Sequence, residues 1–149
     1  MSAKMVTQLV LLGSAGLFTG LLLFVADVLQ RIYNDMTERE FARFLPLQFK
    51  RGGYSVFAVA SQSIPFFGIF IYPIFFGFGD VLFLAGLFVF NLSIVASRFT
   101  TTSLYKKILE TDSGDAAKLN MHRKALGRGN SLRAPIALAG FILMLASLL

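Results

Sequence analysis

The chain of 149 residues contains no cysteine, no tryptophan and a single histidine. Without cysteine it cannot form a disulfide, a thiolate nucleophile or a cysteine-ligated metal site. One histidine and one carboxylate near the apolar segments cannot supply the three or four ligands of a usual zinc, copper or iron centre, nor two axial histidines for a haem. The sequence therefore predicts no metal site and no cofactor.

Charged residues are also scarce, at 15% of the chain, whereas hydrophobic residues make up 56% and include seventeen phenylalanines. With a mean hydropathy of +0.70, this composition is typical of an integral membrane protein. The formal charge of +6 indicates loops that face anionic lipid head groups, because no nucleic-acid recognition motif accompanies it. We therefore expect the lipid bilayer and its anionic head groups as partners, and no nucleic acid.

Four apolar segments predict four membrane-spanning helices. Residues 5–26 carry no charge over 22 positions, which at about 1.5 Å per residue is enough to cross a hydrocarbon core about 30 Å thick. Pro65 and Pro73 in the second segment are tolerated where neighbouring helices satisfy the freed carbonyls. The predicted spans cover about residues 5–30, 54–79, 81–98 and 132–149. Residues 1–149 are thus expected to form one all-α, four-helix membrane domain.

Lysine and arginine are distributed unevenly between the segments that connect these spans. Residues 31–51 hold five of the fourteen basic residues, residues 98–133 hold eight, and Lys4 lies on the opposite side. Connections rich in lysine and arginine usually remain on the cytoplasmic side of a membrane. Both long loops are therefore predicted to be cytoplasmic or matrix-facing, with the two termini on the opposite side.

Both long loops contain signals for short interfacial helices. Thr37 and Glu40 have the spacing of a capping box, and Pro46 is expected to end the helix that follows. One face of this helix is apolar and carries Phe41, Phe44 and Leu45. In the second loop the run DSGD, residues 112–115, offers an Asp or Ser cap for a helix that continues to Gly127 and carries His122.

Small and acidic residues in the first span suggest packing or proton handling. Gly13, Gly16 and Gly20 include a GxxxG pair, which permits close helix packing within the bundle or in a homo-oligomer. Asp27 lies near the end of the span, where acidic residues are functional or paired. Arg31, four residues later, is a partner at helical spacing. A structural ion pair and a proton-handling role both remain open for Asp27.

Two uncharged polar side chains lie inside the second and third spans. Gln62, in the run SQS, and Asn91 are positioned either to form hydrogen bonds between helices or, if they face each other, to line a polar pocket. Together with Asp27 they form the candidate substrate-binding set.

His122, Asn130 and Arg133 lie on one stripe if the helix through them is unbroken. An imidazole can act as a base near neutral pH, and amide and guanidinium donors can stabilise developing oxyanion charge. This set is the candidate catalytic site. The alternative is a solvated basic collar in which Asn130 or Ser131 caps the last span, and the nearby glycines and Pro135 would favour such a break.

The order of these features resembles the small four-span anthrone-oxygenase-like family of bacteria and fungi. The likeness covers a glycine-bearing first span, the loop segment MTEREFARFLPLQFKRGG, a proline-containing second span and HRKALGRGNSLR, in which Asn130 and Arg133 match an Asn-x-x-Arg pattern. The resemblance implies a cofactor-independent oxygenation of an anthrone to an anthraquinone. His122 would be the base that removes the acidic C–H proton, and Asn130 and Arg133 would stabilise the oxyanion.

Two function classes follow from the sequence. The first is a small membrane enzyme, oxygenase-like, that acts on a planar, hydrophobic, phenol-like substrate with phenylalanines of the second and third spans as pocket walls. The second is a non-catalytic accessory subunit that packs through phenylalanine and glycine faces against membrane protein partners or lipid. An enzyme is expected to enclose a cavity reached by His122, Asn130 or Arg133, whereas an accessory subunit is expected to have a filled interior.

Overall fold

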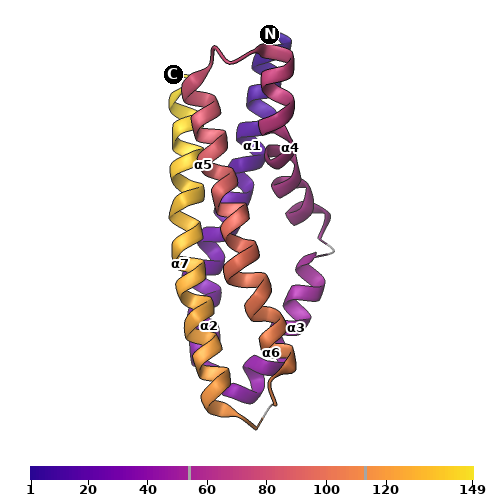
Figure 1. Cartoon of the computed structure of the whole chain (residues 1–149), viewed down its shortest axis with the longest axis vertical. Coiled ribbons are helices and arrows are strands. Elements are labelled where there is room, and N and C mark those ends of the chain that lie inside the picture. The colour runs from indigo at the N-terminus through magenta and orange to yellow at the C-terminus, as the bar shows by residue number, and fades with distance from the viewer. Residues whose placement is uncertain (54, 113) are drawn as a thin grey trace.

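Four long helical rods lie side by side in the computed structural model, which describes residues 1–53, 55–112 and 114–149 (Figure 1). The helices are α1 (Ala3–Phe24), the π-helical turn η1 (Val25–Leu29), α2 (Gln30–Asp35), α3 (Glu38–Gly53), α4 (Val56–Phe76), α5 (Val81–Ser97), the π-helical turn η2 (Arg98–Thr102), α6 (Ser103–Glu110) and α7 (Ala116–Ala146). The described residues contain no strand. The prediction of an all-α, four-helix membrane bundle is confirmed.

Four helical segments are long and apolar enough to cross a membrane: Ala3–Asp35, Val56–Phe76, Val81–Glu110 and Ala116–Ala146. The chain is thus an integral membrane protein. Three of the segments extend well beyond the predicted spans, because the helices continue into the polar loops instead of ending where hydrophobicity ends. The predicted start of the second span, residue 54, lies outside the described residues.

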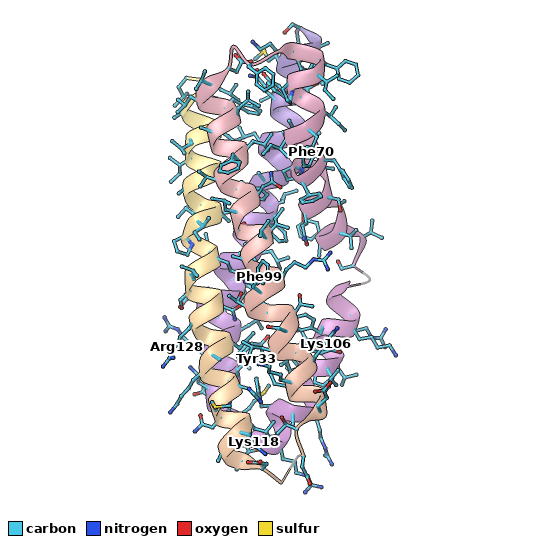
Figure 2. All side chains as sticks on the ribbon, in the orientation of Figure 1. Tyr33, Phe70, Phe99, Lys106, Lys118 and Arg128 are labelled. Carbon is cyan, nitrogen blue, oxygen red and sulfur yellow. The ribbon has the colours of Figure 1, made fainter. Side chains whose placement is uncertain are left out.

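The bundle has two separate hydrophobic cores, one in each half of its length. The larger core lies in the half that contains both termini and is built by α1, α4, α5 and α7, with Ala15, Phe18, Tyr72, Phe83, Phe90 and Ala137 among its buried side chains. The smaller core is built by α2, α3, α6 and the first part of α7, and its buried residues are Tyr33, Phe41, Leu45, Ile108, Leu119 and Leu126. Lys106, Lys118 and Arg128 surround this second half (Figure 2).

The two loop helices begin at the predicted caps. Thr37 and Glu40 form the reciprocal hydrogen bonds of a capping box, with the Thr37 N–H donating to Glu40 Oε2 over 2.8 Å. Asp115 caps α7 by accepting from the N–H of Lys118, whereas Ser113 lies outside the described residues. Pro46 does not end α3 as predicted. A proline removes one backbone hydrogen bond, and the apolar face buried in the smaller core holds the helix together on both sides of it.

The closest approach of one helix backbone to another is made by glycines other than the predicted ones. A Cβ atom on Gly140 of α7 would lie 2.4 Å from the backbone nitrogen of Phe90 and 2.7 Å from the carbonyl oxygen of Gly86 on α5. Of the predicted set, Gly16 packs against the Phe141 ring, while Gly13 and Gly20 have open space beside them. Gly16 thus allows α1 to pack closely against α7, whereas the backbone-to-backbone approach is between α5 and α7.

A polar network joins the N-terminus to the turn between α4 and α5. Gly77, whose φ is +74°, ends α4 in the left-handed region that glycine adopts readily. The ammonium group of Lys4 then contacts the Asp80 carboxylate at 2.7 Å, and the Tyr72 hydroxyl donates to the same carboxylate while accepting from Gln8 Nε2. The hydrogen bonds from Lys4 and Tyr72 lower the pKa of Asp80.

Replacing Asp80 with asparagine is expected to reduce the free energy of unfolding at neutral pH by about 1 kcal/mol, the scale of a partly exposed ion pair with an additional hydrogen bond. Because the pKa of Asp80 is lowered in the folded state, its contribution is complete above the unfolded pKa of about 3.9 and is lost as the pH falls through the folded pKa. Thermal unfolding in detergent at neutral and at acidic pH measures this effect. Equal destabilisation at both pH values would contradict it.

Candidate cationic cleft

A cleft of about 410 Å³ opens between the two cores, where α3 ends and α4 begins. Its apolar wall comes mainly from α1 and α5 and includes Phe18, Leu21, Leu22, Val25 and Ile94. Its polar wall includes Gln48, Gln62, Ser97, Arg98, Thr101, Thr102 and Arg133. The volume is within the range of about 300–1,000 Å³ that is usual for small-molecule sites.

Arg133 is a half-buried cationic residue of this cleft. Its Nη1 donates to the Ser97 hydroxyl over 3.2 Å. Its Nε is buried and has no hydrogen-bond partner among the described residues. A buried guanidinium N–H without an acceptor is unfavourable unless an anion or another acceptor approaches it. The side chain is thus prepared to hold an oxyanion.

Thr101 provides a second unsatisfied polar group in the cleft wall. The residue is 5% exposed, and within the described part of the chain its hydroxyl finds no hydrogen-bond partner. Thr101 belongs to the π-helical turn η2, and Val25 of the turn η1 lies on the apolar wall of the same cleft. Single π-helical turns within α-helices often occur at functional sites. Both π-helical turns in the described part of the chain contribute to one cleft.

The charge of the cleft is positive. Arg98 and Arg133 both line it, and no acidic side chain is among the described residues of its walls. Asp27, the predicted acidic member of the substrate-binding set, lies elsewhere: its carboxylate is mostly exposed and pairs with Arg31 at 2.6 Å. The i, i+4 ion pair that the sequence offered as one alternative for Asp27 is therefore formed.

The other two predicted substrate-binding residues are separated by the fold. Gln62 of α4 lines the cleft. Asn91 of α5 is buried, and its Nδ2 donates to the carbonyl oxygens of Pro65 and Leu87 over 3.2 and 2.8 Å. Asn91 thus connects α5 to α4, whereas Gln62 is available to a ligand.

The helix through the predicted catalytic residues is continuous, but it does not bring them to one point. Gly127, Gly129 and Pro135 all lie within α7, so the predicted break is absent. His122 precedes Arg133 by eleven residues, which at 1.5 Å per residue places them about 16 Å apart along the axis. His122 is buried in the half that contains the smaller core and does not line the cleft.

Asn130 is likewise turned away from the cleft. It is 1% exposed, and its Nδ2 donates to Gln30 Oε1 of α2 over 3.2 Å. The absence of a side chain on Gly127 and Gly129 permits α7 to approach its neighbours, because added Cβ atoms would lie 3.1 Å from Gln30 and 2.9 Å from Thr100. Asn130 therefore helps to hold α2 against α7.

Ser97, Arg98 and Thr101 were not among the predicted site residues. They lie in the run SRFTTTS, where a basic residue and several hydroxyl groups follow the third apolar segment directly. Hydroxyl groups in a membrane helix usually bond to carbonyls of the preceding turn, as Thr100 does here to Ala96 over 2.8 Å. That common behaviour gave no reason to expect a free hydroxyl at Thr101.

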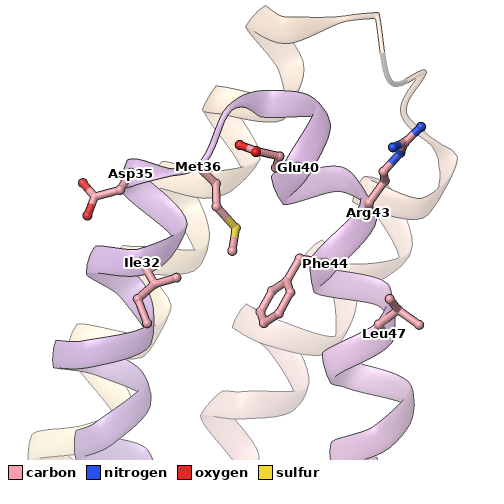
Figure 3. Close-up of a pocket in the computed structure, with 7 residues that line it drawn as sticks. All are labelled: Ile32, Asp35, Met36, Glu40, Arg43, Phe44 and Leu47. Carbon is pink, nitrogen blue, oxygen red and sulfur yellow. The ribbon is translucent and has the colours of Figure 1, made fainter.

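A second concavity, of about 540 Å³, lies between α2 and α3 (Figure 3). Its apolar floor carries Ile32, Met36, Phe44 and Leu47, and charges of both signs lie on its rim. The Glu40 carboxylate at this rim accepts two hydrogen bonds from Thr37, which lower the pKa of Glu40. The Glu40 carboxylate is thus occupied by the hydrogen bonds that cap α3. This second concavity also lacks the excess positive charge of the Arg133 cleft.

No protein-family model, curated protein sequence or solved structure matches the chain. The function is therefore argued from the geometry of the cleft.

Proposed function

We propose that this membrane protein binds a hydrophobic molecule that carries an oxyanion, with the oxyanion on Arg133 and the apolar part against α1 and α5. The observation that carries this proposal is the buried Nε of Arg133, which has no partner among the described residues and belongs to a cleft with an apolar wall. Arginine holds carboxylates, phosphates and phenolates through directed, charge-assisted hydrogen bonds. An enzyme was expected to enclose a cavity reached by His122, Asn130 or Arg133, and of these three residues Arg133 lines the cleft.

An oxygenase-like reaction on an anthrone-like substrate is a more specific form of this proposal. The enolate of such a substrate is a hydrophobic oxyanion, and Arg133 and Gln62 supply donors for it. A general base must lie within hydrogen-bonding reach of the proton it removes. With His122 about 16 Å from Arg133 along α7, the cleft supports binding better than it supports this catalysis.

An accessory role in a larger membrane assembly is the second candidate. It is favoured by the outward-facing phenylalanines of α4 and α5, because Phe67, Phe70, Phe75 and Phe88 are each more than half exposed. Such side chains contact lipid or the helices of a partner. The two roles are compatible, since none of these four phenylalanines lines the cleft.

The orientation of the bundle in the membrane is a further part of the proposal and rests on the positive-inside rule. The half that contains α2, α3, α6 and the start of α7 would face the cytoplasm or matrix, and both termini would lie on the other side. The cleft is then near the inner membrane surface, and the basic loops around it can attract anionic head groups.

The Arg133→Gln variant tests the proposed function with a fluorescent aromatic acid, pyrenebutyrate, and its uncharged counterpart, pyrenebutanol. Loss of one partner from a buried charge pair costs about 2–5 kcal/mol, so we expect at least a roughly 30-fold weaker affinity for the acid. Binding of the alcohol should change little. Titrations of the protein in lipid nanodiscs, followed by pyrene fluorescence, measure both affinities.

Arg128→Gln is the matched control, because Arg128 lies on the same helix, is exposed and is remote from the cleft wall (Figure 2). This variant should bind pyrenebutyrate as the unaltered protein does. Equal affinities of the Arg133→Gln and Arg128→Gln variants for the acid would refute a specific role of Arg133.

His122→Ala tests the catalytic form of the proposal. We expect this variant to retain pyrenebutyrate binding, because His122 does not line the cleft. If the protein oxygenates an anthrone and His122 is the base, turnover of that substrate should be lost while binding and folding are retained. Undiminished turnover would exclude His122 from the reaction.

A further inference from the structure

An outward-facing groove of about 570 Å³ lies between α4 and α5, beside the Arg133 cleft. Phe66 and Phe67 of α4 and Val95 of α5 form its apolar sides, together with Phe99. Phe67 and Phe99 are 57% and 75% exposed, so the groove is open to the surroundings of the bundle. Figure 2 shows Phe99 near the middle of the length of the bundle.

The groove and the cleft share part of their walls. Gln62, Ile94 and Arg98 line both, so these three side chains form the boundary between the interior cleft and the outward-facing groove. Gln62 and Arg98 have long side chains that can change rotamer without a change in the backbone. Rotamer changes of these two side chains can thus open the boundary to a hydrocarbon chain that lies across it.

Resting on the proposed function, we propose that the ligand is a single-chain amphiphile that enters from the bilayer between α4 and α5. Its hydrocarbon chain lies in the groove, and its terminal oxyanion passes Arg98 and Gln62 to reach Arg133. The ligand class is a fatty-acid carboxylate or the phosphate of a single-chain lysophospholipid, because a guanidinium group binds either oxyanion through paired hydrogen bonds.

The depth in the membrane of the boundary between groove and cleft supports this route. Arg98 and Arg133 both lie where the apolar part of their helices meets the polar part. Polar head groups of a leaflet lie at the membrane interface and their chains point toward the bilayer centre, so an amphiphile reaches these arginines without leaving the leaflet. A planar aromatic acid without a chain would occupy the cleft and leave the groove empty.

The absence of tryptophan from the chain permits a direct test of this route. The Phe99→Trp variant places a fluorophore in the groove wall, and the Phe88→Trp variant places one on an exposed part of α5 outside the described groove and cleft walls. Each variant is titrated in nanodiscs with stearate that carries a nitroxide quencher near its methyl end. Val95→Trp is a second reporter in the groove if the Phe99→Trp variant does not fold.

We expect saturable quenching for Phe99→Trp and only linear quenching, from partition into lipid, for Phe88→Trp. Adding Arg133→Gln to Phe99→Trp should weaken the saturable phase at least tenfold. Unlabelled stearate and a single-chain lysophosphatidate compete in separate arms, and the more effective competitor identifies the carboxylate or the phosphate as the preferred oxyanion. A monoacylglycerol, which lacks the charge, should compete at least tenfold less well than that competitor.

Linear quenching in both groove reporters, together with Arg133-dependent binding of pyrenebutyrate, would overturn the proposed route and leave the proposed function intact. Loss of the Arg133 dependence for both ligands would overturn the function as well.

Discussion

Replacing Gly140 with leucine is expected to prevent formation of the native bundle. Even the Cβ of an alanine at this position would lie 2.4 Å from the backbone nitrogen of Phe90 and 2.7 Å from the carbonyl oxygen of Gly86. Both are backbone atoms, so α5 and α7 must separate to make room. Overpacking of this kind costs about 1–3 kcal/mol for small insertions and more for large ones, and these two helices share the most extensive contact in the bundle.

Gly20→Leu is the matched control, since an added Cβ there meets no atom within 4 Å. We expect this variant to remain folded and monodisperse, whereas Gly140→Leu should aggregate or elute as a heterogeneous species in size-exclusion chromatography. Gly140→Ala should fold with a lower melting temperature in detergent. Equal melting temperatures for Gly140→Ala and the unaltered protein would show that α5 and α7 are not in this close contact.

Replacing Phe41 with alanine is expected to unfold the half of the bundle that holds the smaller core. Phe41 is fully buried, its ring meets Tyr33 edge to face at 5.7 Å, and the Arg123 guanidinium lies 4.9 Å from the ring centre. Large-to-small changes at such positions cost about 3–5 kcal/mol. The variant would also remove the cation–π partner of Arg123, whose Nε and Nη2 are buried with no partner in the described part of the chain.

Hydrogen exchange measured by mass spectrometry can separate local from global effects of Phe41→Ala. We expect faster exchange in α2, α3 and α6, and unchanged protection in α1 and α5, because the two cores are separate clusters. Leu47→Ala on the same helix is a suitable control, since Leu47 is 59% exposed and should change stability by no more than about 0.5 kcal/mol. Uniformly faster exchange along the chain would show that the two cores unfold as one unit.

The four apolar helices could be predicted because hydrophobicity and helical capping are local properties of a sequence. The charge-free run after Met5, the capping box at Thr37 and the cap at Asp115 each describe a few neighbouring residues, and each has the expected structure. The ends of the helices were harder to predict. From the sequence, Gly127 and Gly129 indicated a break in the helix. In the structure they lie where α7 contacts Gln30 and Thr100, and such contacts depend on residues distant in the chain.

The candidate site was predictable only in part for the same reason. Gln62 was predicted as a polar side chain inside an apolar span, and Arg133 as part of a helical stripe with His122 and Asn130. Both line the cleft. His122 lies about 16 Å from Arg133 along α7, and Asn130 is bound to Gln30 of α2. Their common stripe therefore did not imply a common site. Thr101 could not be predicted as a site residue, because its hydroxyl is distinguished only by its burial in the folded structure without a partner among the described residues.

The most direct test of the central claim is covalent labelling with a photoactivatable fatty acid that carries a diazirine close to its carboxylate, followed by mass spectrometry of the labelled peptides. The bound carboxylate should place the diazirine among the cleft residues, so we expect saturable adducts on α1 near Leu22 and on α5 near Ile94. Both adducts should be lost in the Arg133→Gln variant. Adducts confined to outward-facing residues such as Phe75 and Phe88, and unchanged by Arg133→Gln, would contradict the claim that Arg133 holds an oxyanion in this cleft.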